Sequence, residues 1–305
     1  MRAAGLLVLL GTWLCGLQSV AAWARFGVSR AVRAAPRGAL SPAAAAGYFE
    51  GAGSIAVQSR GLGLKLTVQK ASDAGEPLPA LREFAEQYKG GSLMPVSATS
   101  TGRRQLWRLM YTAAEPQRAV LQDLLPHLQV KRGQAEAALS MLALDSRSEK
   151  EAKLARGRLV TELNPKNLHD LPAVSSDSIS TAYVAGLVCS GAGTLAFHDG
   201  GIRITFGSKL LAPLFLEIWK NSPDFREKRR PFNNRGELSL ASQEAYEFLT
   251  WILADLPQGD PRTEQACILC DIYENYSNPR WAPLSPESKQ KRDQLVSRLK
   301  ELKQV

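Results

Sequence analysis

The sequence predicts an α+β protein in which one plan of helices and antiparallel strands occurs twice. Two stretches carry this prediction, AAGYFEGAGSI at 45–55 and VAGLVCSGAGTL at 184–195. Each has Ala-Gly, two bulky residues, a run of small residues ending in Ala-Gly, then Ser or Thr and an aliphatic residue. A second pattern, Lys/Arg-x-x-Gln-Ala, also occurs twice, at Lys131 and at Arg262. Similarity at two places along one chain indicates an internal repeat.

The first copy begins with the end of a short helix that runs into a strand. Ala46, Gly47 and Gly51 lie about one turn apart, so this face allows a second helix backbone to approach closely. Segments 54–60 and 62–68 then alternate apolar and polar residues across a Gly turn, which predicts a hairpin.

The remainder of each copy follows the same order. In the first, we expect a helix at 79–89, strands at 93–97 and 105–111, and helices at 115–128 and 134–144. In the second, we expect the motif helix at 179–190, strands at 194–198 and 202–206 across a tight turn, a helix at 211–221, a basic hairpin at 225–240, and helices at 242–255 and 262–274. A charged helix at 286–303 has no expected counterpart in the first copy.

The expected organisation has five parts. They are a targeting leader at 1–40, a first repeat at 41–160, a linker at 161–178, a second repeat at 179–280 and a charged C-terminal helix at 281–305. Two prolines and polar composition mark the linker.

At these residues the chain resembles the LAGLIDADG homing endonucleases, over most of 43–275. The resemblance implies two pseudo-symmetric αββαββα repeats whose motif helices pack at the axis. It also implies a saddle of antiparallel strands with its concave face in the DNA major groove, where base edges are distinguishable. A single chain with both repeats is expected to act as a monomer.

The resemblance further implies one metal-binding acid at the end of each motif helix, because two such acids hold the divalent ions that cleave DNA. The first acid position falls on Ala52, and the second on Ala192 or Gly191. Glu50 occupies an earlier acidic position of the motif, with Cys189 as its counterpart. The sequence therefore predicts no cofactor, with Mg²⁺ bound only if cleavage is retained and Glu50 supplies a ligand.

Other family features survive in part. The basic residue near the family's active centre aligns to Lys131 and Arg262, and the polar residue that holds a catalytic water aligns to Gln69, with Ser208 as a weaker counterpart. The alternative is that Lys131 and Arg262 cap helices and that Gln69 is a surface residue.

Polar residues on the outer strand faces are candidates for contacts with nucleic acid, because Gln can bond adenine and Arg or Lys can reach guanine or phosphate. The alternative is an ordinary solvated sheet face. The candidates are Gln58, Arg60, Lys65, Thr67, His198, Arg203, Thr205, Arg226, Lys228, Arg229, Arg230 and Arg235.

The net charge of +9 is distributed unevenly over the 305 residues. Residues 1–49 hold five Arg and no acid, so removing them from 38 basic residues leaves 33 against 29 acidic ones. A mildly basic globular part indicates a local basic face. An apolar run at 5–17 followed by an Ala- and Arg-rich segment at 24–39 is typical of a signal plus a transit peptide. We expect an organelle, a plastid rather than a mitochondrion, with secretion as the alternative, and no stable membrane insertion after the leader is removed.

Cysteine and histidine give no further site. Outside the leader the sequence has Cys189, Cys267 and Cys270, an odd number that indicates no disulfide framework. Its three His are scattered, so no metal cluster or catalytic triad is expected.

The expected function is binding of double-stranded DNA by a homing-endonuclease-like protein that has lost metal-dependent phosphodiester cleavage. The first alternative is an organelle maturase that binds structured intron RNA and acts in splicing. The others are a still-active DNA endonuclease and a scaffold that binds no nucleic acid.

Overall fold

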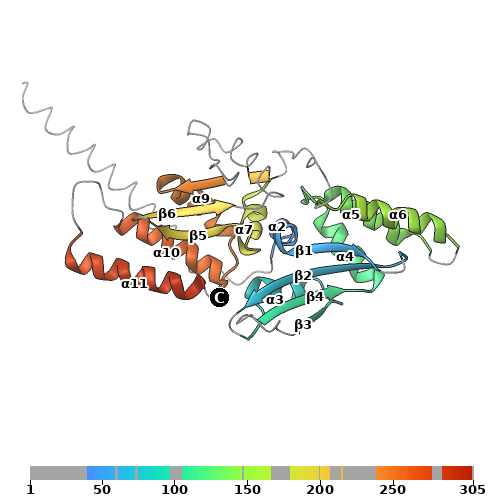
Figure 1. Ribbon diagram of the computed structural model, residues 1–305, viewed down its shortest axis with the longest axis horizontal. Coiled ribbons are helices and arrows are strands. Elements are labelled where there is room, and N and C mark those ends of the chain that lie inside the picture. The colour runs from blue at the N-terminus through green and yellow to red at the C-terminus, as the bar shows by residue number, and fades with distance from the viewer. Residues whose placement is uncertain are drawn as a thin grey trace, which may run out of the picture. The chain divides into compact units, whose positions relative to one another are not determined.

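In the computed structural model, the two motif stretches form a pair of short helices that lie side by side (Figure 1). Helix α2 spans Pro42–Ala52 and helix α7 spans Thr181–Cys189. A serine caps the N-terminus of each: the hydroxyl of Ser41 accepts from the backbone N–H of Ala44, and that of Ser180 from the N–H of Tyr183. Both helices are buried along almost their whole length.

The two helices pack with their backbones in direct contact at two glycines. A Cβ atom on Gly47 would lie 1.9 Å from the carbonyl oxygen of Tyr183, and one on Gly186 would lie 2.0 Å from that of Ala44. No side chain fits in either place unless the helices move apart. The predicted contact of the motif helices is confirmed, and the small residues of the motif explain it.

The first sheet is antiparallel, with its four strands in the order β1-β2-β4-β3. The strands are β1 (Gly53–Val57), β2 (Leu64–Ser72), β3 (Ser92–Val96) and β4 (Gln105–Tyr111). Its register places Ile55 opposite Leu66 and Val68 opposite Leu109, so one face is apolar. Helices α3 (Pro79–Gln87) and α4 (Ala114–Leu124) cover that face, and Leu81, Phe84 and Leu121 join its core. The other face, called the open face below, carries side chains that are mostly half-buried or exposed.

The second sheet has the order β5-β6-β7, with β5 at Thr194–His198, β6 at Gly201–Phe206 and β7 at Leu238–Ala241. Leu195, Ile204 and Leu240 stand opposite one another on its core face. Helix α9 (Gln243–Ile252), followed by a 3₁₀ turn at Leu253–Asp255, covers this face, with Phe248 edge-on to Phe206. The opposite face carries Thr194, Arg203 and Thr205.

Two helix pairs flank the sheets and correct one prediction. Helix α6 (Lys150–Glu162) packs on α5 (Arg132–Ala143), and α11 (Pro286–Lys303) packs on α10 (Pro261–Tyr276). The Nε2 of Gln134 donates to the carbonyl of Val160, and the Nε2 of Gln265 donates to that of Leu302. The prediction that the charged tail has no counterpart is wrong, because α6 has the same relation to α5. Charged composition concealed the few buried positions of α6.

The structure describes residues 40–58, 61–72, 75–96, 105–145, 148–165, 179–198, 200–206, 214–215, 238–276 and 284–303. The predicted leader, most of the linker, the helix at 211–221 and most of the basic hairpin lie outside these residues. Superposition of 43–145 on 179–275 stays a prediction. Within the described ranges, no helix is both long enough and apolar enough to cross a membrane.

Candidate nucleic-acid interface

The C-terminal ends of α2 and α7 border a cavity of about 490 Å³. Gly51 and Ala52 come from α2, and Ser190 follows α7. Gln69, Ala71 and Leu106 belong to the open face of the first sheet, and Thr194 belongs to that of the second. The cavity therefore joins both open faces to the helix ends. The remaining lining residues are Lys70, Leu78, Leu195, Asp260, Pro261, Arg262, Gln265 and Leu302.

The two positions expected to carry metal-binding acids are both half-buried alanines at this junction. Helix α2 continues to Ala52, whereas α7 ends at Cys189 and turns through Gly191, which has φ +86°. This left-handed turn accommodates the extra residue of the second motif. A Cβ on Gly51 would lie 3.8 Å from the Cβ of Ala192, so the two helix ends are neighbours. Among the described residues, no group of three or more His, Cys, Asp or Glu is placed to hold a metal ion.

Glu50, the alternative metal ligand, is buried and bonded to a loop of its own half. Its Oε1 accepts from the backbone N–H groups of Gln129, Val130 and Lys131 at 2.8, 2.9 and 3.1 Å. Burial raises the pKa of the Glu50 carboxyl, and the nearby Lys131 ammonium offsets part of that rise. Glu50 therefore fixes the loop that precedes α5, and it does not line the cavity.

Lys131 caps the C-terminus of α2. Its Nζ donates to the carbonyls of Phe49 at 2.8 Å, Glu50 at 2.6 Å and Gly53 at 2.8 Å. An ammonium has three N–H donors, and these bonds use all of them. In this structure Lys131 therefore caps a helix, as the alternative expects, while a phosphate contact of Lys131 stays a prediction.

Two charged residues near the end of α7, Lys70 and Asp260, were missed by sequence reasoning. The Nζ of Lys70 donates to the carbonyl of Ser190 at 2.6 Å. Asp260 lies in the same cavity, where its Oδ1 accepts from the backbone N–H of Arg262 at 2.9 Å. Burial raises the pKa of Asp260, while the Arg262 N–H and the Lys70 charge oppose the rise.

The buried acid of the second half stands at a different position from that of the first half. Cys189 stands where the first half has Glu50, and Asp260 lies two residues before Arg262, as Gln129 lies two residues before Lys131. The guanidinium of Arg262 lines the cavity and donates to Gln265 Oε1 at 3.3 Å. With Lys70 and Arg262 against one Asp260, the charged side chains of the lining carry a net positive charge.

A stability measurement tests the role of Lys131. Lys131→Met keeps the length of the side chain and removes the ammonium, so three carbonyls lose their donor and Glu50 loses its nearest cation. We expect a loss of about 2–3 kcal/mol in the free energy of unfolding. Lys150→Met, at an exposed position on α6, is the matched control and is expected to stay within about 0.5 kcal/mol of wild type. Equal effects of the two changes would contradict the capping role.

The candidate binding residues of the first sheet differ in their exposure to solvent and in their hydrogen bonds. Gln58 is exposed and its Nε2 donates to the carbonyl of Leu64; Lys65 is half-buried on the open face. Thr67 points to that face but is only 4% exposed and is bonded to the hydroxyl of Ser54, so the expectation of a contacting Thr67 is wrong here. With its amide oriented so that the oxygen faces Arg108, Gln69 accepts from the Nε of Arg108 at 2.7 Å.

The described candidates of the second sheet lie on its open face, and their contact with nucleic acid stays a prediction. His198 and Arg203 are exposed, Thr205 is half-buried, and all three lie on the open face. The remaining candidates, Arg60, Arg226, Lys228, Arg229, Arg230 and Arg235, lie outside the described residues, as does Ser208.

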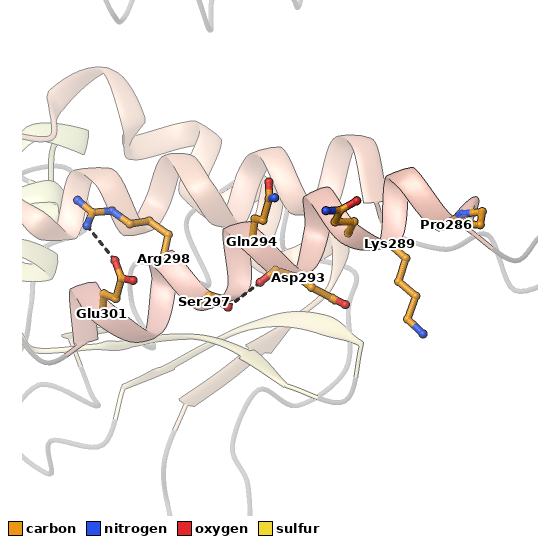
Figure 2. Close-up of a pocket in the computed structure, with 8 residues that line it drawn as sticks. Pro286, Lys289, Asp293, Gln294, Ser297, Arg298 and Glu301 are labelled. Atoms are coloured by element: carbon orange, nitrogen blue, oxygen red, sulfur yellow. Dashed lines mark hydrogen bonds and ion pairs between the residues drawn. The ribbon is translucent and has the colours of Figure 1, made fainter.

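A larger and more open hollow of about 720 Å³ runs along α11 (Figure 2). Its described lining residues all belong to α11, and Arg298 among them is bonded to Glu301 and to Glu264 of α10. Nothing in it resembles a catalytic or binding constellation. It is lined by Pro286, Lys289, Gln290, Asp293, Gln294, Ser297, Arg298 and Glu301.

The fold is similar to that of a solved DNA-binding enzyme. The LAGLIDADG meganuclease I-AabMI, solved bound to uncleaved DNA, matches 86% of this chain and 97% of its own, with a TM-score of 0.54 and 13% identity. The chain has a LAGLIDADG-type fold. At this identity the likeness concerns the fold alone. The paired glycine-rich helices and antiparallel sheets are the elements that carry it.

The other similarities do not extend beyond the LAGLIDADG-type fold. The homing endonuclease I-CvuI, solved with the I-CreI target in 2 mM Mg and with its DNA not cleaved, has 17% identity and a TM-score of 0.33 over 50% of this chain and 95% of its own; no argument rests on it. No protein-family model matches the chain, and no curated protein sequence does.

Proposed function

We propose that the chain binds double-stranded DNA through the open faces of its two sheets and does not cleave it. The observation that carries the proposal is the junction of both faces with the motif-helix ends. There the cavity is lined by Lys70 and Arg262, whose charges attract backbone phosphates, and by the methyl group of Ala52. Ala192, at or beside the second acid position, lies next to Gly51 at the same helix ends and is also a methyl group. The site therefore keeps cations that favour DNA binding and lacks the acids that cleavage requires.

Two further points support DNA as the ligand. The structurally similar meganuclease was solved with DNA bound, and its fold is the one found here. An antiparallel sheet face suits the wide major groove of B-DNA, whereas the major groove of an RNA helix is too narrow for side chains to read. We infer duplex DNA rather than structured RNA as the main ligand.

The salt dependence of binding tests this proposal. A labelled duplex is titrated with the protein in EDTA at several salt concentrations, and we expect binding without Mg²⁺ and a linear fall of log K with log salt. Lys65→Ala and Arg203→Ala remove one cation from each sheet. Each change is expected to make the slope of log K against log salt shallower by about 0.9, the contribution of one phosphate contact.

Lys150→Ala provides the control, because Lys150 is exposed on α6, away from the open faces, and should leave the slope unchanged. Equal slopes for all variants would place the binding surface elsewhere. Tighter binding of intron RNA than of duplex DNA at the same salt would favour the maturase alternative.

A further inference from the structure

The open face of the first sheet carries four large apolar side chains over β3 and β4, beside Ser92 and Arg108. Met94 and Val96 of β3 and Leu106 and Met110 of β4 all point to this face, because their strand positions alternate with the core residues Leu93 and Leu109. The four side chains are half-buried, and none is among the residues packed against the hydrophobic core. An apolar stretch on a sheet face that should contact a polar ligand requires an explanation.

The register extends the stretch into cross-strand rows. Ala71 stands opposite Leu106, which stands opposite Val96, and Thr67 stands opposite Met110. Between these rows, Gln69 stands opposite Arg108 and is bonded to its guanidinium. The polar pair is therefore bonded within the sheet. Ala71, Leu106 and Met110 flank it as apolar side chains, whereas Thr67 is buried and bonded to Ser54, and Ser92 stands at the start of β3.

The charge of this face points to an anionic occupant. Its described residues include two cations, Lys65 and Arg108, and no Asp or Glu. A protein partner with an apolar surface would have no use for this imbalance. DNA offers phosphates together with an apolar group in the major groove, the 5-methyl group of thymine.

We propose that Met94, Val96, Leu106 and Met110 contact thymine methyl groups, so that this half of the sheet prefers T-rich segments of duplex DNA. The proposal rests on the proposed function and adds base preference to it. It also separates DNA from RNA, whose uracil lacks the methyl group.

Replacing thymine by deoxyuridine tests the inference without changing the base pairing. An A·T-rich duplex of 30 base pairs is compared with the same duplex carrying deoxyuridine at every thymine, in EDTA at fixed salt. We expect the affinity to fall about fourfold for each methyl group that the protein buries. In a second comparison, 5-methylcytosine in place of cytosine in a G·C duplex is expected to raise the affinity.

A protein variant links the effect to this surface. In Met94→Gln/Met110→Gln, the preference for thymine over deoxyuridine should shrink, while the salt slope stays that of wild type. If the variant loses its salt dependence as well as its preference for thymine, the variant is misfolded. The comparison of thymine and deoxyuridine duplexes with the wild-type protein then tests the inference by itself.

The outcomes separate the inference from the proposed function. Equal affinity of wild type for the thymine and deoxyuridine duplexes, and for the cytosine and 5-methylcytosine duplexes, would overturn the inference and leave DNA binding intact. Failure to bind any of the four duplexes would overturn both.

Discussion

Gly47→Ala is expected to lower the free energy of unfolding by about 3 kcal/mol, the upper end of the cost of overpacking. The added Cβ would lie 1.9 Å from the backbone carbonyl of Tyr183, so no side chain can rotate away to make room. The two motif helices must separate instead. Chemical denaturation of the variant and the wild type measures the effect.

Gly133→Ala is the matched control for this prediction. Gly133 lies in α5, and the nearest atom to an added Cβ is the Cδ1 of Leu163 at 4.0 Å. With space available, the same change is expected to stabilise the protein by about 0.5 kcal/mol through its effect on the unfolded chain. Similar effects at Gly47 and Gly133 would show that the helices are not in backbone contact.

A double substitution sharpens the test. Gly186→Ala alone should resemble Gly47→Ala, because its Cβ would lie 2.0 Å from the carbonyl oxygen of Ala44. Once the first added Cβ has separated the two helices, the second added Cβ lies farther from the opposite backbone. Gly47→Ala/Gly186→Ala should therefore cost less than the sum of the single changes. A strictly additive result would mean that the two contacts are independent.

The sequence was sufficient where local pattern decides structure. Period-two alternation in Leu64, Leu66 and Val68 predicted the buried face of β2, and these residues are at most 2% exposed. The paired glycines predicted the helix contact for the same reason, because a backbone approach requires small residues at fixed spacing. Element ends shifted by only a few residues, as in the helix expected at 79–89 and found at Pro79–Gln87.

Long-range contacts explain what the sequence did not reveal. Lys70 caps a helix that lies 120 positions further along the chain, and nothing in the alternation of β2 marks it for that role. Asp260 precedes a Pro at the start of α10, a pattern that indicates only a helix start. Thr67 occupies an outward position in the alternation, yet its neighbours on adjacent strands bury it.

The central claim concerns the chemistry at the motif-helix ends. Metal-dependent cleavage needs acidic ligands that hold divalent ions against their hydration. Among the described residues that line the cavity, Asp260 is the one carboxylate, and it is bonded to a backbone N–H and flanked by Lys70 and Arg262. These cations oppose the binding of a divalent ion at Asp260. The proposed binding of DNA without cleavage rests on that balance of charge.

The measurement that tests this claim most directly is a cleavage assay with Mg²⁺ or Mn²⁺ on duplexes that the protein binds. We expect wild type to bind in EDTA and to leave every duplex intact in either metal, with a rate lower by orders of magnitude than that of an enzyme carrying both acids. Ala52→Asp/Ala192→Asp, which places a carboxylate near each helix end, is assayed alongside it for restored cleavage. Specific cutting by wild type that disappears in EDTA would contradict the account, because a metal ligand would then exist that the structure does not show.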